Sequence, residues 1–339
     1  MNFNTLPGKA SLYGIRSGQG PRVLLGGMVA SAYVTTAETD GNFSLHMLTG
    51  GIGAGLPLVR HSDTLTSLFI LDGVVELTLN DRRVRMSRGD SASIPPGAAY
   101  AFRMLRPHTV AVMAQTGAAP GRLIASLGQH CESFIPPETG AGQAEDLSSA
   151  VPGDDDTQIL GLPDADALLE EPGTALPEGT EPFTLAAGEG TRLLVADQLF
   201  TFAAANTQTG DRMLTLQTEG PVGDMIPPHK HLLHDEMFFC LDGAVRLRSG
   251  ETELELAPGD FLFVPRGTPH AYQFLKPYTR MVGWLCPGVF EEFFHCLGEP
   301  TELRSYPQTP GPFRFDRVMA RIDEFDMVPL GGPAPADAS

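Results

Sequence analysis

The sequence is poor in positive charge and in long apolar runs, and each shortage excludes a class of protein. Its 339 residues include 23 Lys and Arg against 41 Asp and Glu, which gives a formal net charge of −18. A chain that binds nucleic-acid phosphates or an anionic membrane surface needs a basic face, so neither partner is expected. No run reaches the about 18 apolar residues of a transmembrane helix, and the first residues lack the pattern of a signal peptide. We therefore expect a cytoplasmic protein.

Cysteine is also scarce. The four cysteines form no Cys-x-x-Cys pair, and two of them, Cys240 and Cys286, lie in apolar runs. A buried free thiol behaves as a small hydrophobic side chain. The pattern therefore predicts free thiols rather than disulfides, which fits a cytoplasmic location.

The overall composition is that of a folded chain with many turns. Apolar residues make up 42% and charged residues 19%, which is enough for a buried core. At roughly 100–200 residues per domain, the length predicts two domains. The 38 glycines and 29 prolines favour many short strands joined by turns.

Positive charge is missing altogether from one internal stretch. Between Arg122 and Arg192 there is no Lys or Arg, while 14 Asp and Glu give this interval −14 of the net −18. Residues 132–182 are therefore interpreted as an acidic linker, because the stretch also contains Pro136-Pro137, Pro152-Gly153, Pro172-Gly173 and Pro177. Within it, Pro163–Glu171 predicts a short helix with acids in its first turn. Asp154–Asp156 lacks the alternating oxygen ligands and the glycine of a calcium loop, so calcium is not expected.

On either side of this stretch the sequence repeats itself at a constant offset of 170 residues. Residues 18–128 and 188–298 share 26 identities in 111 positions without a gap. The identities gather on Gly, Pro and Asp, which turns require, as in Phe69–Gly73 and Phe239–Gly243. The chain is therefore expected to hold two copies of one domain.

Each copy is expected to be an all-β barrel. Short apolar or alternating runs in the second copy are separated by turn residues, which predicts a closed barrel or sandwich with few edges. These runs are Arg192–Ala196, Met237–Leu241, Ala244–Arg248, Glu253–Leu256 and Asp260–Val264. Each copy then ends in a helical stretch, which in the second is Gly288–Leu297. We assign residues 1–131 to the N-terminal barrel, 183–325 to the C-terminal barrel and 326–339 to a disordered tail.

The second copy contains a cluster of possible metal ligands. His229 and His231 are two residues apart and face the same side of a strand, and Glu236 follows a turn at the start of the next strand. His270 follows the segment Pro265-Arg-Gly-Thr-Pro269 and lies on a later strand. Three neutral imidazoles and one carboxylate inside an apolar barrel suit a divalent transition metal. One such ion per chain is therefore expected, with coordination positions left for substrate or dioxygen.

His234 lies between these ligands, and the sequence leaves its role open. It is an alternative ligand, a side chain that supports a ligand, or an exposed histidine in a turn. The histidines His46, His108, His130 and His295 have no comparable neighbours and are expected to be structural.

The first copy does not repeat this cluster. At an offset of 170 the four ligand positions hold Val59, His61, Thr66 and Tyr100. A single imidazole does not hold a metal, so the N-terminal barrel is expected to be metal-free and to have a structural or regulatory role. Metal-free chemistry by His61 and Tyr100 would need a second base or a nucleophile, which the nearby sequence does not supply.

The two motifs of the second copy resemble those of cupins. The segment His229-x-His231-x4-Glu236-x6-Gly243 is similar to the first cupin motif, and Gly259-Asp260-x4-Pro265-x-Gly267-x2-His270 is similar to the second. Over roughly residues 10–322 the chain resembles the bicupins of the quercetin (flavonol) 2,3-dioxygenase family, most of all its bacterial members. The segments that carry this resemblance are Ser17–Arg22, Gly188–Arg192, Gly220–Asp224, Glu236–Gly243, Pro287–Phe294 and Phe313–Val318. It implies two tandem jelly-roll barrels in one chain.

The resemblance also implies an activity. Such enzymes cleave the heterocyclic ring of a flavonol, or of a similar aromatic substrate that bears an enol or phenol, with dioxygen and release carbon monoxide. By the resemblance, Glu236 is both a ligand and the base that takes the substrate's hydroxyl proton, and the metal is a Lewis acid. Iron is favoured, while manganese, nickel, copper, cobalt and zinc are also compatible. A homodimer is implied as well.

Four side chains are expected to line the substrate site, because each is an even number of residues from a ligand and so faces the same side of its strand. We call this relation strand parity. The four side chains are Met225, Phe238, Tyr272 and Phe274.

The resemblance is incomplete at one point, and this leaves other functions open. In that family the N-terminal barrel usually carries a metal. Here Val59, Thr66 and Tyr100 stand at three of its four ligand positions, so that metal is not expected. The alternatives are a metal-dependent isomerase, cyclase or decarboxylase, and a ligand-binding bicupin without activity. A decarboxylase would need a carboxylate-binding arginine near the site, but strand alternation turns Arg246 and Arg248 toward solvent.

Overall fold

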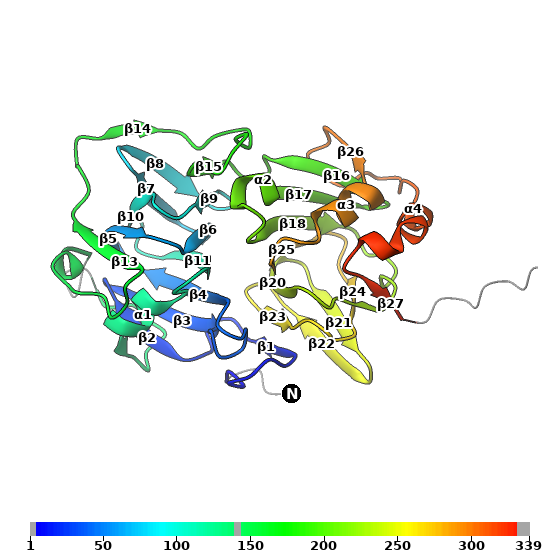
Figure 1. Ribbon diagram of the computed structural model, residues 1–339, viewed down its shortest axis with the longest axis horizontal. Coiled ribbons are helices and arrows are strands. Elements are labelled where there is room, and N and C mark those ends of the chain that lie inside the picture. Colours follow the sequence, from blue (N-terminus) through cyan, green and yellow to red (C-terminus); the bar gives the residue numbers. More distant parts are fainter. Residues whose placement is uncertain (1–4, 139–143, 331–339) are drawn as a thin grey trace, which may run out of the picture.

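The computed structural model describes residues 5–138 and 144–330, which form two β-barrels side by side (Figure 1). Strands dominate, and the helices are few and short. The all-β architecture expected from the sequence, with one barrel for each copy, is thereby confirmed.

The N-terminal barrel is built from two sheets. Its eight-stranded sheet has the order β12 (Gln129–His130), β2 (Arg22–Leu25), β3 (Met28–Val34), β4 (Phe43–Gly50), β11 (Thr109–Thr116), β6 (Leu65–Asp72), β9 (Ser91–Ile94) and β15 (Phe183–Leu185). Its six-stranded sheet has the order β13 (Thr157–Gly161), β5 (Gly55–His61), β10 (Ala99–Met104), β7 (Val74–Leu79), β8 (Arg82–Ser87) and β14 (Leu168–Glu170).

The C-terminal barrel repeats this plan with a more open second sheet. Its eight-stranded sheet has the order β1 (Tyr13–Ile15), β23 (Phe261–Val264), β20 (Asp235–Asp242), β25 (Thr279–Cys286), β18 (Leu214–Gly220), β17 (Gln198–Ala204), β16 (Thr191–Val195) and β26 (Glu299–Pro300). The facing strands are β22 (Thr252–Leu256), β21 (Val245–Ser249) and β24 (Ala271–Phe274), together with the separate pair β19 (His229–Lys230) and β27 (Val328–Pro329).

Short helices close the barrels, as expected. The helix α1 (Arg122–Leu127) ends the first barrel and α3 (Glu291–Leu297) ends the second, each followed by a glycine. The others are α2 (Asn206–Thr209), α4 (Phe315–Ala320), and the 3-10 turns η1 (Ala144–Leu147) and η2 (Ile322–Glu324). In the described part of the chain, no helix is long and apolar enough to cross a membrane.

Side-chain alternation explains which strands face solvent. In β22, Leu254 and Leu256 are buried while Glu253 and Glu255 are exposed, as a strand with one wet face requires. All residues of β23 are buried, because this strand lies between two layers. The apolar runs identified in the sequence thus become the strands of the barrel wall.

The two barrels share one apolar core between their eight-stranded sheets. Tyr33 and Phe69 from the first copy pack with Phe239, Phe261 and Trp284 from the second, and all five are buried. The centroids of the Phe69 and Trp284 rings are 6.5 Å apart, with the rings edge to face. This continuous core makes the barrels one body rather than two beads on a linker.

Each barrel also donates a strand to the other. The strand β1 pairs with β23 of the C-terminal barrel, and β15 pairs with β9 of the N-terminal barrel. The two donated strands are equivalent, because residues 13–15 become 183–185 at the offset of 170. The sheets therefore do not follow the boundaries at residues 131 and 183 that the sequence indicated.

A buried aspartate anchors each donated strand. Asp260 accepts the backbone N–H of Ser17 at 2.9 Å and pairs with Arg16 at 2.5 Å. Its equivalent, Asp90, accepts the backbone N–H of Ala187 at 2.8 Å. These are the Gly-Asp positions that the two copies share.

Two expectations about the connecting segments are wrong. Pro163–Glu171 is not a helix, since Leu168–Glu170 forms a strand that pairs in parallel with the edge of β8. The tail is ordered at its start, because β27 pairs with β19. Residues 331–339 of the expected disordered tail lie outside the described residues.

The thiols follow the expectation. All four cysteines are free, and Cys240, Cys286 and Cys296 are buried. None of them takes part in a disulfide.

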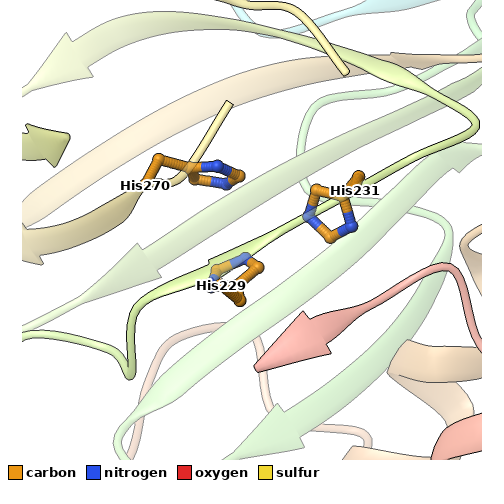
Figure 2. Close-up of side chains that lie close together, drawn as sticks. All are labelled: His229, His231 and His270. Carbon is orange, nitrogen blue, oxygen red and sulfur yellow. The ribbon is translucent and has the colours of Figure 1, made fainter. Parts of the chain in front are cut away.

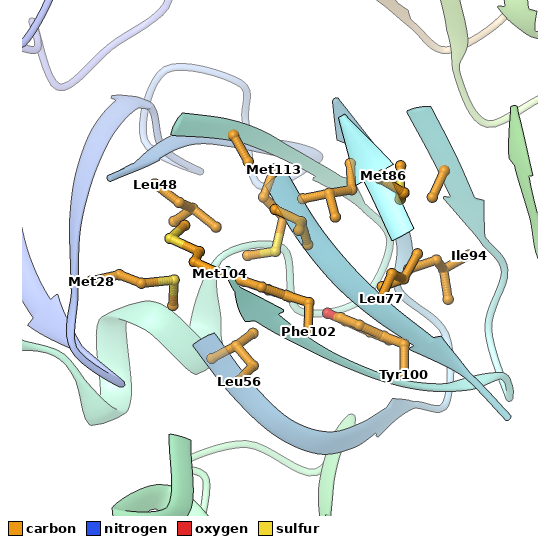
Figure 3. Packing of buried hydrophobic residues seen from close by; sticks show 14 of the residues in the cluster. Met28, Leu48, Leu56, Leu77, Met86, Ile94, Tyr100, Phe102, Met104 and Met113 are labelled. Carbon is orange, nitrogen blue, oxygen red and sulfur yellow. The ribbon is translucent and has the colours of Figure 1, made fainter. Parts of the chain in front are cut away.

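The interior of the N-terminal barrel is filled by long apolar side chains. Figure 3 shows Met28, Leu48, Phe102, Met104 and Met113 packed together inside it, and all five are buried. Dispersion contacts among such side chains make a dense core.

Candidate metal centre

The four expected ligands meet on one side of the C-terminal barrel. His229 lies on β19 and His270 immediately precedes β24, and two backbone hydrogen bonds of 3.0 and 2.8 Å join these residues. His231 follows β19, and Glu236 lies on β20. Figure 2 shows the three imidazole rings turned toward one another.

The hydrogen bonds of the three rings select the nitrogen that is free to bind. Each Nδ1 faces a backbone carbonyl oxygen, which only accepts, so each Nδ1 carries the hydrogen and donates it. The neutral ring then keeps its lone pair on Nε2. The pairs are His229 with Pro227 at 2.8 Å, His231 with Asp326 at 2.5 Å and His270 with Thr268 at 3.0 Å.

The distances and the burial fit a metal ion. One ligand atom from each of His229, His231 and His270 lies within 4.8 Å of the others. The carboxylate of Glu236 is 2.9 Å from Nε2 of His270 and 3.6 Å from Nε2 of His231. In the part of the chain that the structure describes, the buried Nε2 of His231 has no hydrogen-bond partner. An unsatisfied buried lone pair is costly, and coordination of a cation satisfies it.

The charge states also suit a metal. Burial lowers the pKa of His229 to about 4, helped by the neighbouring His270, and burial lowers the pKa of His231 to about 3. Burial alone would raise the pKa of Glu236, but His231 and His270 outweigh it and hold that pKa well below its usual value. For His270, burial lowers the pKa but the Glu236 carboxylate outweighs it and raises it. His229, His231 and Glu236 are therefore in the forms that bind a metal, namely neutral imidazoles and an ionised carboxylate.

His234 is part of this cluster and is not an exposed turn residue. Its side chain is 0% exposed, with Nδ1 2.8 Å from a carboxylate oxygen of Asp326 and Nε2 3.7 Å from the carboxylate of Glu236. Burial lowers its pKa, but these two carboxylates outweigh burial and raise it. His231, His234 and Glu236 form a second group with ligand atoms within 4.8 Å, so His234 is placed either to bind or to support a ligand.

The cluster borders an apolar cavity of about 550 Å³ in the C-terminal barrel. Met225, Phe238 and Tyr272 line it, as expected from strand parity. Phe274 does not: it is buried in the core beside Tyr272, with ring centroids 5.5 Å apart. The sequence reasoning missed a further group of lining residues from the C-terminal helices and tail, namely Phe290, Phe293, Phe294, Phe313, Phe315, Met327 and Leu330.

Polar side chains at the cavity include two acids, Asp197 and Asp224, beside the candidate ligands. None of the described residues that line it is Lys or Arg. The Tyr272 hydroxyl donates to Oε1 of Gln198 at 2.7 Å. Arg246 pairs with Glu253 at 2.9 Å on the outside of the barrel, and Arg248 is exposed, so both point to solvent as expected.

The equivalent positions of the N-terminal barrel hold a closed polar cluster. Nε2 of His61 is 3.2 Å from the Tyr100 hydroxyl, and its Nδ1 is 3.2 Å from the Thr157 hydroxyl and 3.4 Å from Asp156. Burial lowers the pKa of His61 more than Asp156 raises it, and burial raises the pKa of Tyr100 to about 12. Both ring nitrogens of His61 thus have side-chain partners within the protein. Among the described residues, both groups that suit a metal lie in the C-terminal barrel.

Known proteins are similar to this chain in sequence and in fold. The Cupin domain family model matches residues 47–114 and 217–277, one segment in each barrel. The chain is 37% identical over 329 residues to quercetin 2,3-dioxygenase of Bacillus subtilis, which covers 96% of this chain and 97% of that protein. It is 32% identical over 143 residues to quercetin 2,3-dioxygenase of Aspergillus japonicus, or 40% of this chain and 41% of that protein.

Two solved structures share the fold at low sequence identity. Oxalate decarboxylase from Bacillus subtilis matches with a TM-score of 0.55 and 16% identity, over 82% of this chain and 77% of that chain. Protein Ylba from E. coli matches with a TM-score of 0.56 and 10% identity, over 85% and 95%. These likenesses establish the fold alone, whereas the nearly full-length match to the Bacillus dioxygenase establishes the family. The chain therefore belongs to the quercetin 2,3-dioxygenase family of metal-dependent cupin dioxygenases.

Proposed function

We propose that this chain cleaves a flavonol, or a similar aromatic substrate with an enol or phenol hydroxyl, at its C-terminal barrel. The observation that carries the proposal is that His229, His270 and Glu236 meet at the wall of an apolar cavity, with His231 close beside them. The cavity volume of about 550 Å³ lies in the usual range for small-molecule sites, roughly 300–1,000 Å³.

Four side chains would hold one divalent metal ion. His229, His231 and His270 offer Nε2, and Glu236 offers a carboxylate oxygen. Iron is favoured, while manganese, nickel, copper, cobalt and zinc suit the same donors. When bound, such an ion supplies a Lewis acid for the substrate oxygen and a place for dioxygen beside it.

The protein's own groups prepare the substrate. The Glu236 carboxylate is ionised and buried, so it can accept the proton of the substrate's hydroxyl. Met225 and Phe238 offer apolar and aromatic contact to a flat ring system. Tyr272 contributes a ring whose hydroxyl is already tied to Gln198. Filling this cavity excludes water from the reacting centre.

Two alternative functions, a decarboxylase and a ligand-binding protein without activity, make different demands on the residues of the cavity. A decarboxylase of a small acid needs a cationic group for the substrate carboxylate, and none of the described lining residues supplies one. The acids Asp197 and Asp224 at the cavity would instead repel such an anion. A ligand-binding protein without activity would hold metal and aromatic ligand without consuming dioxygen.

The test is metal content and dioxygen uptake with quercetin and a panel of related polyphenols. His231→Ala and Glu236→Ala should lose metal and dioxygen uptake together. The matched controls are His61→Ala and Thr66→Ala, which change the equivalent positions of the N-terminal barrel and should keep both. Undiminished uptake in His231→Ala and Glu236→Ala would overturn the site, and tight metal without uptake on any polyphenol would favour the binding protein.

A further inference from the structure

The end of the described chain returns to the metal ligands. Residues 326–330, here named the strap, run antiparallel to β19, with His229 opposite Pro329 and Lys230 opposite Val328. The backbone N–H of Leu330 donates to the carbonyl of Pro228 at 2.8 Å. The strap therefore lies along the strand that carries the first ligand.

Asp326, the first residue of the strap, holds the loop between two histidines. Its carboxylate accepts the backbone N–H groups of Leu232 at 2.7 Å, Leu233 at 2.9 Å and His234 at 3.2 Å. Leu232 and Leu233 are 52% and 60% exposed, whereas the Asp326 side chain is only 4% exposed. A buried carboxylate thus fixes a loop that otherwise lies at the surface.

The same residue also fixes two imidazole rings. Its backbone carbonyl accepts from Nδ1 of His231 at 2.5 Å, and its carboxylate accepts from Nδ1 of His234 at 2.8 Å. Burial would raise the pKa of Asp326, but His234 and the loop amides outweigh it and lower it to about 2. Such partners fix the orientation and tautomer of a ligating histidine, and their loss typically weakens metal binding.

The first copy contains the same strap without the metal ligands. At the offset of 170, Asp156 is the equivalent of Asp326, and β13 after it pairs with β5 as β27 pairs with β19. The Asp156 carboxylate accepts the backbone N–H of Asp63 at 2.6 Å and the hydroxyl of Ser62 at 2.8 Å. Holding the loop is therefore common to both barrels, so Asp156 offers a control for the purely structural part of the role.

We propose that Asp326 is a positioning residue of the metal centre, which holds His231 and His234 in the arrangement that binds the ion. The proposal rests on the proposed function in one respect, namely that the C-terminal barrel is the one that binds metal. It goes further, because it assigns metal affinity to a carboxylate 92 residues away from His234 in the chain.

The test measures Co²⁺ binding to the metal-free full chain, by visible absorption and by competition with a chelator. Asp326→Ala should weaken Co²⁺ affinity by about 10- to 100-fold and change the absorption band. The variant keeps the backbone carbonyl that accepts from His231, but His234 and the loop amides lose the carboxylate that holds them. Asp326→Asn keeps the volume and one acceptor oxygen, so it should give a smaller loss in the same direction. Asp156→Ala should leave Co²⁺ affinity unchanged although it removes the equivalent loop contacts.

Folding is checked by circular dichroism, and if Asp326→Ala does not fold, Asp326→Asn decides. The proposal is overturned if the folded Asp326 variant binds Co²⁺ as tightly as the wild type, or if Asp156→Ala weakens binding equally. His231→Ala separates this failure from failure of the proposed function: if it leaves Co²⁺ binding intact, the C-terminal site itself is wrong.

Discussion

Replacing Gly283 with alanine tests whether the C-terminal cavity is the substrate site. Gly283 lies on β25 and lines the cavity, and a Cβ added to it would lie 3.1 Å from Cδ1 of Phe238. The phenyl ring would have to move by a few tenths of an ångström. The equivalent residue of the first copy is Met113, whose buried side chain helps to fill the N-terminal barrel.

The expected loss follows from the cost of one extra carbon in an apolar pocket. One methylene group too many or too few changes recognition by about 1–3 kcal/mol, or roughly 10- to 200-fold in kcat/KM. We therefore expect Gly283→Ala to lower kcat/KM for the proposed flavonol substrate by about tenfold or more, mainly through KM. Metal content should stay the same, because Gly283 is on the wall and offers no ligand atom.

Met113→Ala is the matched control in the other barrel. Removing a buried methionine side chain leaves a cavity and typically costs about 2–5 kcal/mol of stability. The variant should therefore unfold at lower urea concentration while its kcat/KM stays at the wild-type value. Initial rates of dioxygen uptake, metal analysis and urea unfolding measure the three quantities. Full kcat/KM in Gly283→Ala, or lost kcat/KM in a folded and metal-loaded Met113→Ala, would refute the assignment of the substrate site.

The remaining predictions concern pH, metal and the donated strand. Burial lowers the pKa of His46 to about 4 in the folded chain. Below about pH 6.5 the unfolded chain therefore binds a proton that the folded chain does not bind. As the pH falls from 6.5 to 4, the free energy of unfolding should decrease by at most about 3 kcal/mol. His46→Leu, which copies Leu216 of the second copy, should flatten this fall in urea unfolding at pH 7 and pH 5, and an unchanged slope would contradict it. A hundredfold excess of metal over its Kd should stabilise the wild type by about 2.7 kcal/mol in calorimetry and should not stabilise Glu236→Ala; equal stabilisation of both would exclude Glu236 as a ligand. Asp260→Ala removes the anchor of Arg16 and should lower the free energy of unfolding by about 3 kcal/mol, while no change in urea unfolding would show that the anchor is dispensable.

The fold could be predicted because its signals are local and repeated. Turn glycines such as Gly73 and Gly243 adopt positive φ, which side chains rarely adopt, so their recurrence at one offset marks equivalent turns. The prediction of a helix in the linker was wrong because a long-range contact, which no local signal shows, decides the structure there. The Ala-Leu-Leu centre of that segment has helical propensity, but the edge of β8 offers backbone hydrogen bonds to Leu168–Glu170, and this long-range pairing prevails.

The convergence of the candidate metal ligands was predictable from spacing, but the contacts that Asp326 makes with them were not. His229 and His231 share a face because they are two residues apart on a strand, which is a property of the backbone alone. The partner of His234 comes from a segment that looked like a tail, and no local pattern links the two. The identity of Asp156 and Asp326 at the offset of 170 was the available signal, and it lies beyond residues 18–128 and 188–298, where the repeat was measured.

Strand parity predicted part of the cavity wall and failed at Phe274. Tyr272 and Phe274 are two residues apart on β24, yet only Tyr272 lines the cavity. Phe274 packs instead against Gly220, where an added Cβ would lie 3.2 Å from the ring. Parity gives the side of a strand, but the curvature of the barrel decides which residues on that side reach the cavity.

The exchange of β1 and β15 is similar to domain swapping but occurs within a single polypeptide, since equivalent strands are exchanged between two copies of one unit. Neither half is then a complete folding unit. A fragment that held one barrel would expose the bare edge of β9 or of β23, and unpaired edges invite aggregation. This interlock gives the N-terminal barrel a structural role although it repeats only one of the four candidate ligands, because deleting it would remove an edge strand from the C-terminal barrel.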